Sequence, residues 1–311
     1  MDDKDKELIF LSESLESDRH ALFWSQVKEF ISISYLPELK FAEERFLVPE
    51  DFVEHKLLIN RNLKTLSLVT KNLIKKFTDN VNVDDEIIQL LILLCGENMD
   101  DELWTTKEIV KTTENLLDDF LKFINISNLK KLLFEYKVNF AFTLLTKLRP
   151  KLLKDSWKRF PAAISCYKFL LFHIESPHLS ENIDSVLPTA LIVLDDHVVS
   201  NRVIAIKCIE HIINNSTSTD LTLLGRGNLL YKTMEPLIHF RDPEVFPALI
   251  SCIIALLTKT EHPEELKWTH FDDVFNIWLP GIEIEQKIKS RIMNMQCLTK
   301  FIKAAGIACI F

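Results

Sequence analysis

Apolar residues recur about every 3.6 positions along almost the whole chain, which is the pattern of helices with one buried face. The segment 17–34 is a clear example, with five apolar side chains on one stripe: Leu22, Phe23, Val27, Phe30 and Ile31. A similar stripe, which includes Leu57, runs through residues 50–77. No alternation of β-branched and polar residues extends over four or more positions. The pattern therefore predicts an all-α chain.

Polar residues that can accept the first backbone N–H groups of a helix precede several of these segments. Asp84 and Asp85 stand before the apolar run 86–95. Thr105 or Thr106 is placed in the same way before the helical pattern that follows it. These residues predict where two of the helices begin.

An acidic turn between two helices recurs in the second half of the chain. Residues 187–213 contain an apolar helical segment, then Asp195 and Asp196, then a second helical segment. Counted from Asp155, the turns at Asp196, Asp242 and Glu285 follow at intervals of 41, 46 and 43 residues. HEAT-type repeats have a period of about 40–47 residues. The sequence predicts an all-α, HEAT-like helical repeat solenoid of antiparallel helix pairs, in which the turn aspartate caps the second helix.

The same patterns divide the chain into four predicted regions. Residues 1–16 are predicted to be an acidic tail, and 17–155 to be divergent helical repeats. Residues 156–303 are predicted to form the HEAT-like repeats, and 304–311 an atypical apolar tail.

Composition excludes several classes of protein. The chain has five glycines, where average usage gives about 22, which disfavours phosphate loops and glycine-rich turns. The net charge of −8 leaves no basic face for nucleic acid. No apolar stretch approaches the roughly 20 residues of a membrane span, and the N-terminus is acidic where a secretory signal is basic. Six cysteines without a CxxC pair are predicted to be buried in a reducing compartment.

Candidate chemistry is sparse. Asp195, Asp196 and His197 contain acid and base groups, but the HExxH spacing of a metal site is missing and the turn explains both aspartates. The pairs Ser165–Cys166 and Ser251–Cys252 lack a glycine elbow and a nearby histidine. We expect no enzymatic activity, no catalytic residue, no cofactor and no metal.

Gly225, Arg226 and Gly227 resemble a short anion-binding loop, because backbone N–H groups and an arginine can meet an anion. A P-loop needs a lysine and a serine or threonine after its last glycine, and these are missing. We therefore interpret the segment as a turn that leads into a helix, on which Leu229 and Tyr231 pack inward.

The region 187–257 contains more specific detail than a generic repeat. A helix that contains Leu-Pro is followed by a turn with paired aspartates. The next helix contains Asn-Arg near its start, then a Cys and a His, and an Asn at its end. Gly-Arg and Leu-Tyr open the next repeat. The residues are Leu187, Pro188, Asp195, Asp196, Asn201, Arg202, Cys208, His211, Asn214, Gly225, Arg226, Leu230 and Tyr231. The region resembles the family of the second Tel-two-interacting protein, the smallest subunit of the triple-T co-chaperone complex. Ala205 departs from the glycine expected there.

The resemblance implies a non-catalytic scaffold that is present in the cytoplasm and the nucleus. It implies direct partners in Tel-two and the first Tel-two-interacting protein. Through them it implies an indirect role with the Hsp90 machinery in maturing phosphatidylinositol-3-kinase-related kinases. The family continues for further repeats, so the apolar end at 304–311 is expected to mark a shortened form. A HEAT- or armadillo-type adaptor in transport or nuclear import fits the same fold and stays open.

The resemblance also indicates which residues are candidates for partner binding. Partner docking is expected to depend on the C-terminal half, with Asp196 and Arg202 holding a repeat together and Asn201 and Arg226 exposed for direct contact. The full set of candidate partner-binding or family-motif residues is Asp195, Asp196, Asn201, Arg202, His211, Asn214, Gly225, Arg226 and Tyr231.

Overall fold

The computed structural model describes residues 3–13, 20–77, 83–261 and 268–306, and every regular element in these ranges is a helix. The all-α class expected from the apolar period is confirmed. The helices form two compact units, which are Met1–His173 (unit 1) and Ile174–Phe311 (unit 2). Among the described helices, none has a stretch long and apolar enough to span a bilayer.

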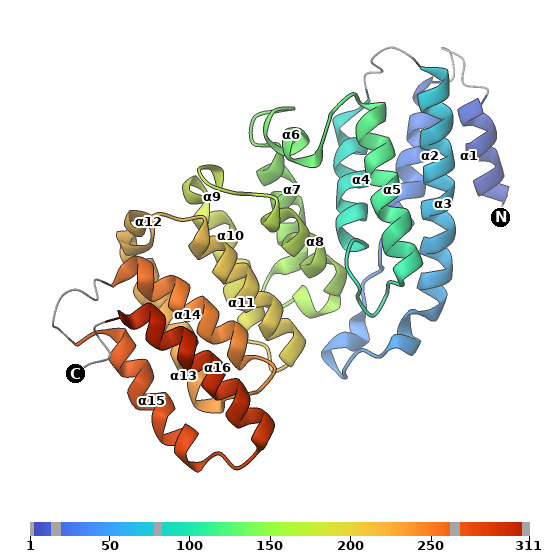
Figure 1. Cartoon of the computed structure of the whole chain (residues 1–311). Helices are drawn as coiled ribbons and strands as arrows, with labels where there is room; N and C mark the ends of the chain where they lie inside the picture. The colour runs from blue at the N-terminus through green and yellow to red at the C-terminus, as the bar shows by residue number, and fades with distance from the viewer. Residues whose placement is uncertain (1–2, 14–19, 78–82, 262–267, 307–311) are drawn as a thin grey trace. The chain divides into compact units, whose positions relative to one another are not determined.

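Unit 1 is built around long neighbouring helices. Its α-helices are α1 (Asp3–Glu13), α2 (His20–Ser32), α3 (Val53–Lys76), α4 (Asp85–Glu97), α5 (Lys107–Phe123), α6 (Leu129–Phe134), α7 (Phe140–Leu148) and α8 (Pro161–Phe172). Short 3-10 turns lie at η2 (Lys40–Glu43), η3 (Pro49–Phe52), η4 (Arg149–Leu152) and η5 (Trp157–Arg159). Helix α3 packs against α1 and α5, while α4 packs against α2 and α8 (Figure 1).

Two helix starts in unit 1 follow the predicted capping. The Asp84 side chain accepts the backbone N–H of Glu86 at 3.1 Å, at the start of α4. The Thr106 side chain accepts the backbone N–H of Ile109 at 3.3 Å, at the start of α5. Each contact satisfies a backbone donor that has no partner inside its helix.

The N-terminal region differs from its prediction. Residues 3–13 of the predicted acidic tail 1–16 form α1, which packs on α3 and buries Leu8. Asp5 is also buried and lies 3.3 Å from the Arg61 guanidinium of α3. The acidic composition concealed this packing, because many of the contacts of α1 are polar, such as the bond from Asn72 of α3 to the Ser12 hydroxyl at 3.0 Å.

Two residues of the predicted inward stripes face solvent instead. Leu22 on α2 and Leu57 on α3 are 57% and 72% exposed. On α2, Phe23, Val27 and Phe30 are buried as expected. Leu57 lies on the side of α3 opposite its buried residues, and Leu22 lies outside the arc that the buried residues of α2 form. The prediction that both belong to the buried stripes is therefore wrong.

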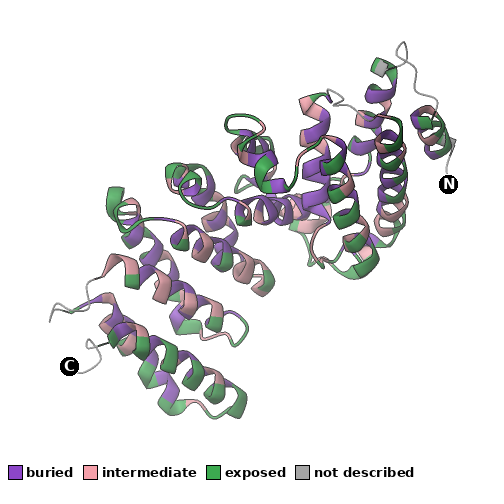
Figure 2. Cartoon of the chain, turned by 45° about the horizontal axis from the view of Figure 1, so that its top comes forward, coloured by how far each residue is buried: buried purple, intermediate pink, exposed green. Residues whose placement is uncertain are grey.

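Unit 2 consists mainly of helix pairs. Its elements are α9 (His178–Glu181), α10 (Ile183–Leu194), α11 (Val199–Asn214), α12 (Ser218–Thr222), η6 (Leu223–Gly225), α13 (Arg226–Phe240), α14 (Phe246–Thr260), α15 (His270–Ile284) and α16 (Ile288–Ala305). The pairs α10–α11, α13–α14 and α15–α16 pack together, and α14 also packs against α11 and α16. The turns of these pairs contain Asp196, Asp242 and Glu285, as the repeat spacing predicts. Figure 2 shows buried and exposed sides along these helices.

A glycine inside α15 allows close packing between the first helices of two repeats. A Cβ atom built on Gly281 would lie 1.0 Å from an Nη1 atom of Arg241. Arg241 ends α13 in the left-handed conformation, with φ of 45°. Its guanidinium therefore occupies the space that a side chain at position 281 would need.

Candidate protein-interaction site

The turn between α10 and α11 is stabilised by its own polar residues. The buried Asp196 carboxylate accepts the Asn201 side-chain N–H at 2.8 Å. The Asp196 carbonyl accepts the Nε–H of Arg202. These two bonds hold the turn against the first turn of α11.

The predicted capping role of Asp196 is wrong in its detail. Val198 occupies the N-cap position of α11, with no side-chain cap. Asp196 lies two residues earlier, so its carboxylate meets the Asn201 side chain in the first turn of the helix. Asn201 is half-buried and bonded in this turn, which does not fit its expected role as an exposed contact residue.

The acid and base groups of this turn do not form a metal site. His197 is exposed, and its Nδ1 lies 3.1 Å from Asp196 Oδ1, whereas Asp195 is exposed at the end of α10. Nowhere in the described parts of the chain do three or more His, Cys, Asp or Glu side chains come together to hold a metal ion.

The C-terminus of α11 binds a lysine from the next repeat. Lys259, in the last turn of α14, donates to the carbonyl oxygens of Ile213, Asn214 and Ser216 at 2.8, 2.9 and 2.7 Å. Ile213 and Asn214 are the last residues of α11, where the helix dipole is negative, and Ser216 follows two residues later. Burial lowers the pKa of Lys259. Asn214 thus contributes its backbone carbonyl to the contact between two repeats.

His211 joins the same end of α11 to the start of unit 2. Its Nε2 lies 2.9 Å from the Ile174 carbonyl oxygen. Asn215, one turn later, accepts the backbone N–H of Ser176 at 3.3 Å. His211 therefore positions the segment that precedes α9.

The Arg226 side chain bonds to other residues of unit 2. Two of its guanidinium nitrogens donate to the Asp184 carboxylate of α10 at 3.1 and 2.8 Å. A third contact reaches the Asp220 carbonyl of α12 at 3.1 Å. Only 13% of the Arg226 side chain is exposed, so the expectation that it is an exposed residue is wrong. The preceding Gly225 has φ of 67°, which lets the chain turn into α13.

Tyr231 is buried against the next repeat. Its ring centroid lies 4.1 Å from that of His270, which begins α15, and His270 Nδ1 lies 2.5 Å from a Glu261 carboxylate oxygen. Burial raises the pKa of the Tyr231 hydroxyl. The predicted inward packing of Leu229 is wrong, because Leu229 is exposed and its neighbour Leu230 is buried.

Three mammalian proteins of one name are similar to this chain in sequence. The human TELO2-interacting protein 2 is 28% identical over 172 residues, which are 53% of this chain and 34% of the human protein. The rat protein of the same name is 27% identical and the mouse protein 26% identical, each over 168 residues, covering 51% of this chain and 32% of theirs. The chain is a relative of TELO2-interacting protein 2. The family resemblance seen in the sequence is thereby confirmed, although the match spans about a third of the length of these relatives.

Two further comparisons add little. No protein-family model matches the chain. The crystal structure of an engineered protein aligns with 99% of this chain and 92% of its own, at 11% identity and a TM-score of 0.36. Similarity at that level supports no conclusion.

The serine and cysteine pairs of this TELO2-interacting protein 2 relative are structural. The Ser165 hydroxyl donates to Glu102 at 2.9 Å, and the Ser251 hydroxyl donates to Glu210 at 2.5 Å, between α14 and α11. Burial raises the pKa of the adjacent thiols of Cys166 and Cys252. Five cysteines are free and buried, as predicted: Cys95, Cys166, Cys208, Cys252 and Cys297. Cys309 lies outside the described residues.

A buried carboxylate in unit 1 is a feature that the sequence gave no reason to expect. Glu97, at the end of α4, is 2% exposed and accepts the backbone N–H of Leu36 at 3.2 Å. Lys151 Nζ lies 4.0 Å from its other oxygen. Burial raises the pKa of Glu97 to about 7, with Lys151 acting in the opposite direction. The group is closed off from solvent and serves the packing of unit 1.

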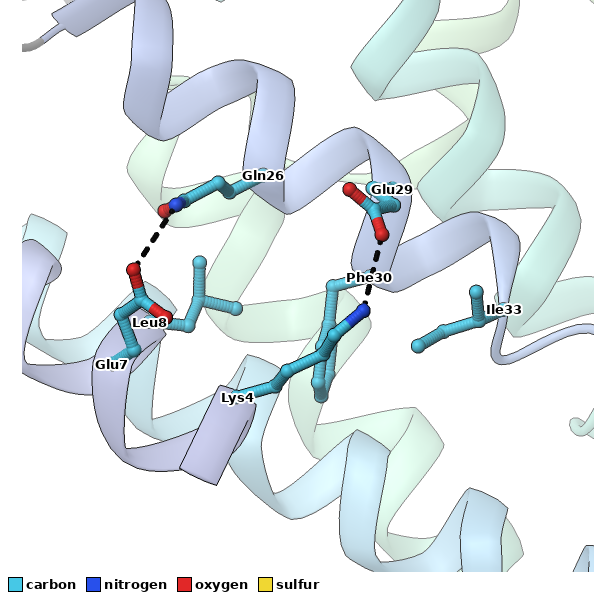
Figure 3. Close-up of a pocket in the computed structure, with 7 residues that line it drawn as sticks. All are labelled: Lys4, Glu7, Leu8, Gln26, Glu29, Phe30 and Ile33. Atoms are coloured by element: carbon cyan, nitrogen blue, oxygen red, sulfur yellow. Dashed lines mark hydrogen bonds and ion pairs between the residues drawn. The ribbon is translucent and has the colours of Figure 1, made fainter. Parts of the chain in front are cut away.

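A small pocket lies between α1 and α2 (Figure 3). Leu8 and Phe30 contribute buried apolar surface, while Lys4 pairs with Glu29 at 3.2 Å and Gln26 donates to Glu7 at 3.4 Å. These polar groups bind one another, so the pocket lacks a converging set of reactive side chains. The exposed faces of the helices are therefore the stronger candidates for binding in this TELO2-interacting protein 2 relative.

Proposed function

We propose that this chain is a non-catalytic scaffold that binds TELO2 and the first TELO2-interacting protein as part of the triple-T co-chaperone complex. In this proposal the complex works with the Hsp90 machinery to mature phosphatidylinositol-3-kinase-related kinases, in the cytoplasm and the nucleus. The observation that carries it is the sequence match to three mammalian proteins named TELO2-interacting protein 2.

The geometry of unit 2 supports a binding role for its helix faces. The polar residues of its turns and helix ends, such as Asp196, Arg226 and Lys259, bond to neighbouring helices of the same unit. Their function is to set the position of each repeat. A stack held in this way presents the outward faces of its helices as a fixed surface, which is how helical repeat proteins bind partners.

Affinity purification of the tagged full chain tests the proposal. We expect TELO2 and the first TELO2-interacting protein to co-purify in near-stoichiometric amounts and to remain bound at moderate salt. A tagged helical-repeat protein of similar size and charge serves as the control bait. Recovery of import receptors or transport cargo in place of TELO2 would overturn the proposal in favour of an adaptor.

A second measurement tests the expectation that docking depends on the C-terminal half. Leu223→Ser with Leu229→Ser changes exposed apolar residues of unit 2, and Leu57→Ser with Val138→Ser changes exposed ones of unit 1. We expect the first pair to weaken TELO2 recovery more than the second. The opposite order would place docking on unit 1.

A further inference from the structure

Helix α16 has a buried face and, on the opposite side, an exposed row of apolar residues. Its buried face contains Ser290, Asn294, Cys297, Phe301 and Ala305. A second row, Ile288, Ile292, Met295 and Ile302, is 43–74% exposed, and we call it the α16 stripe. Each member of the stripe through Met295 lies two residues before a buried position, which corresponds to a rotation of about 200° around an α-helix. The α16 stripe therefore faces away from α14 and α15, against which the buried face packs.

The spacing of the α16 stripe is that of a surface for helix packing. Together with Thr299, its positions follow the order i, i+4, i+7, i+11, i+14, which is the heptad pattern of a helix that packs along another helix. From Ile288 to Ile302 the stripe extends roughly 21 Å. An occupant that matches this length and spacing is itself a helix of about four turns.

The charged residues beside the α16 stripe indicate which charges the partner helix carries. Helix α16 contains Lys289, Arg291, Lys300 and Lys303 and no acidic residue. All four are exposed, and within the ranges that the structure describes none of them forms an ion pair. Arg291 and Lys303 flank the stripe on opposite sides, each about 60° from its centre. A helix with acidic residues beside its apolar row is therefore the complementary partner.

We propose that the α16 stripe docks an amphipathic helix from another protein, with heptad-spaced apolar residues flanked by glutamate or aspartate. Pairing of two α16 helices from two copies of this chain is disfavoured, because it would bring their cations together. The inference goes beyond the proposed scaffold function, since it assigns a surface and a partner chemistry that do not depend on which complex the chain joins.

Fluorescence anisotropy with a synthetic peptide tests the proposal on the full chain. The probe is a labelled peptide of about two heptads, with leucine at the apolar positions and glutamate beside them, and the control peptide has lysine in place of glutamate. We expect the glutamate peptide to bind at least tenfold more tightly than the lysine peptide. The difference should shrink between about 0.1 M and about 1 M salt, as the Debye length falls from roughly 10 Å to 3 Å.

Variants locate the binding on α16. Ile292→Ser with Met295→Ser should weaken the glutamate peptide about tenfold or more, whereas Leu68→Ser with Leu153→Ser, which changes exposed leucines of unit 1, should not. Arg291→Glu with Lys303→Glu should reverse the preference toward the lysine peptide. The four α16 positions changed in these variants, 291, 292, 295 and 303, are exposed. Circular dichroism checks that the helices persist in each variant.

Several results would overturn the proposal. One is the absence of glutamate-peptide binding, and another is equal binding of both peptides. A third is binding that the control leucine variant reduces as much as the α16 variant does. Dimerisation of the wild-type chain that is lost on Ile292→Ser with Met295→Ser would instead assign the stripe to a second copy. None of these results depends on whether TELO2 co-purifies.

Discussion

At the scale of single residues, Glu97 shows how burial makes stability depend on pH. Its pKa is raised from 4.5 to about 7, mainly by burial. Between those values the folded chain holds a proton that the unfolded chain releases. Stability is therefore expected to fall as pH rises through this range, because the folded state binds more protons.

We predict that Glu97→Gln becomes relatively more stable than the wild type as pH rises from 5 to 8. A raised pKa of this size corresponds to a change of up to about 3 kcal/mol in the relative free energy of unfolding. Urea unfolding of both proteins at the two pH values measures it. Glu54→Gln, at an exposed position of α3, is the control and should show no such change. An equal difference between Glu97→Gln and wild type at both pH values would contradict the assignment.

Arg226 gives a second prediction at this scale. Arg226→Ala removes bonds to Asp184 and to the Asp220 carbonyl, and hydrogen bonds to charged groups contribute about 1.5–3 kcal/mol each. Because Asp184 is largely exposed, we expect a loss near 2 kcal/mol in the free energy of unfolding.

A double-mutant cycle with Asp184→Ala measures the part that belongs to the pair. The Asp220 carbonyl contact should make Arg226→Ala costlier than Asp184→Ala. Equal costs for the two single variants would show that this contact contributes nothing.

These residues also show what sequence reasoning can and cannot find. The pattern around Asp196 and Arg202 predicts a bonded turn, because the partners lie within six residues of each other. It does not reveal that Arg226 is buried, because Asp184 lies 42 positions away. Glu97 is hidden for the same reason, since its carboxylate meets Leu36 across 61 positions.

At the scale of elements, the end of α11 depends on a side chain from α14. The 3.6-residue period predicts both helices, but it does not predict where the Lys259 side chain binds. The structure shows that its three N–H groups bind the carbonyls of the preceding repeat. Contacts between repeats depend on register, which the apolar period of one helix does not specify.

We predict that Lys259→Met lowers the free energy of unfolding by about 2 kcal/mol, because the end of α11 loses its charged donor. Hydrogen exchange should increase first in the last turn of α11 and in residues 213–216. Lys232→Met, at an exposed position of α13, should stay within about 0.5 kcal/mol of the wild type. Unchanged exchange at the end of α11 would show that water replaces the lysine without cost.

At the scale of the whole molecule, the spacing of the turn acids predicts the helix pairs of unit 2, and the sparse glycine content predicts their all-helical character. The division into two units at residues 173 and 174 is not visible in the sequence, because the apolar period continues across it. The packing of α1 is not visible in the sequence either, because the segment has the composition of a solvated one.

The two units lead to a prediction about cooperativity. Each has its own core, and in repeat proteins stability comes mainly from neighbouring elements. Lys259→Met should therefore accelerate hydrogen exchange within unit 2, most strongly at the end of α11, while Glu97→Gln should change exchange only in unit 1. Equal acceleration in both units by either variant would indicate one cooperative structure.

The contact between Gly281 and Arg241 restricts how the two positions can diverge. Because the guanidinium occupies the space of a Cβ atom, a larger residue at 281 must displace it. Arg241→Ala would open that space and should make Gly281→Ala tolerable, or even stabilising, since alanine favours a helix by about 1 kcal/mol over glycine. Among natural variants of this chain, alanine at 281 and a short side chain at 241 should therefore occur together, as a covarying pair 40 positions apart.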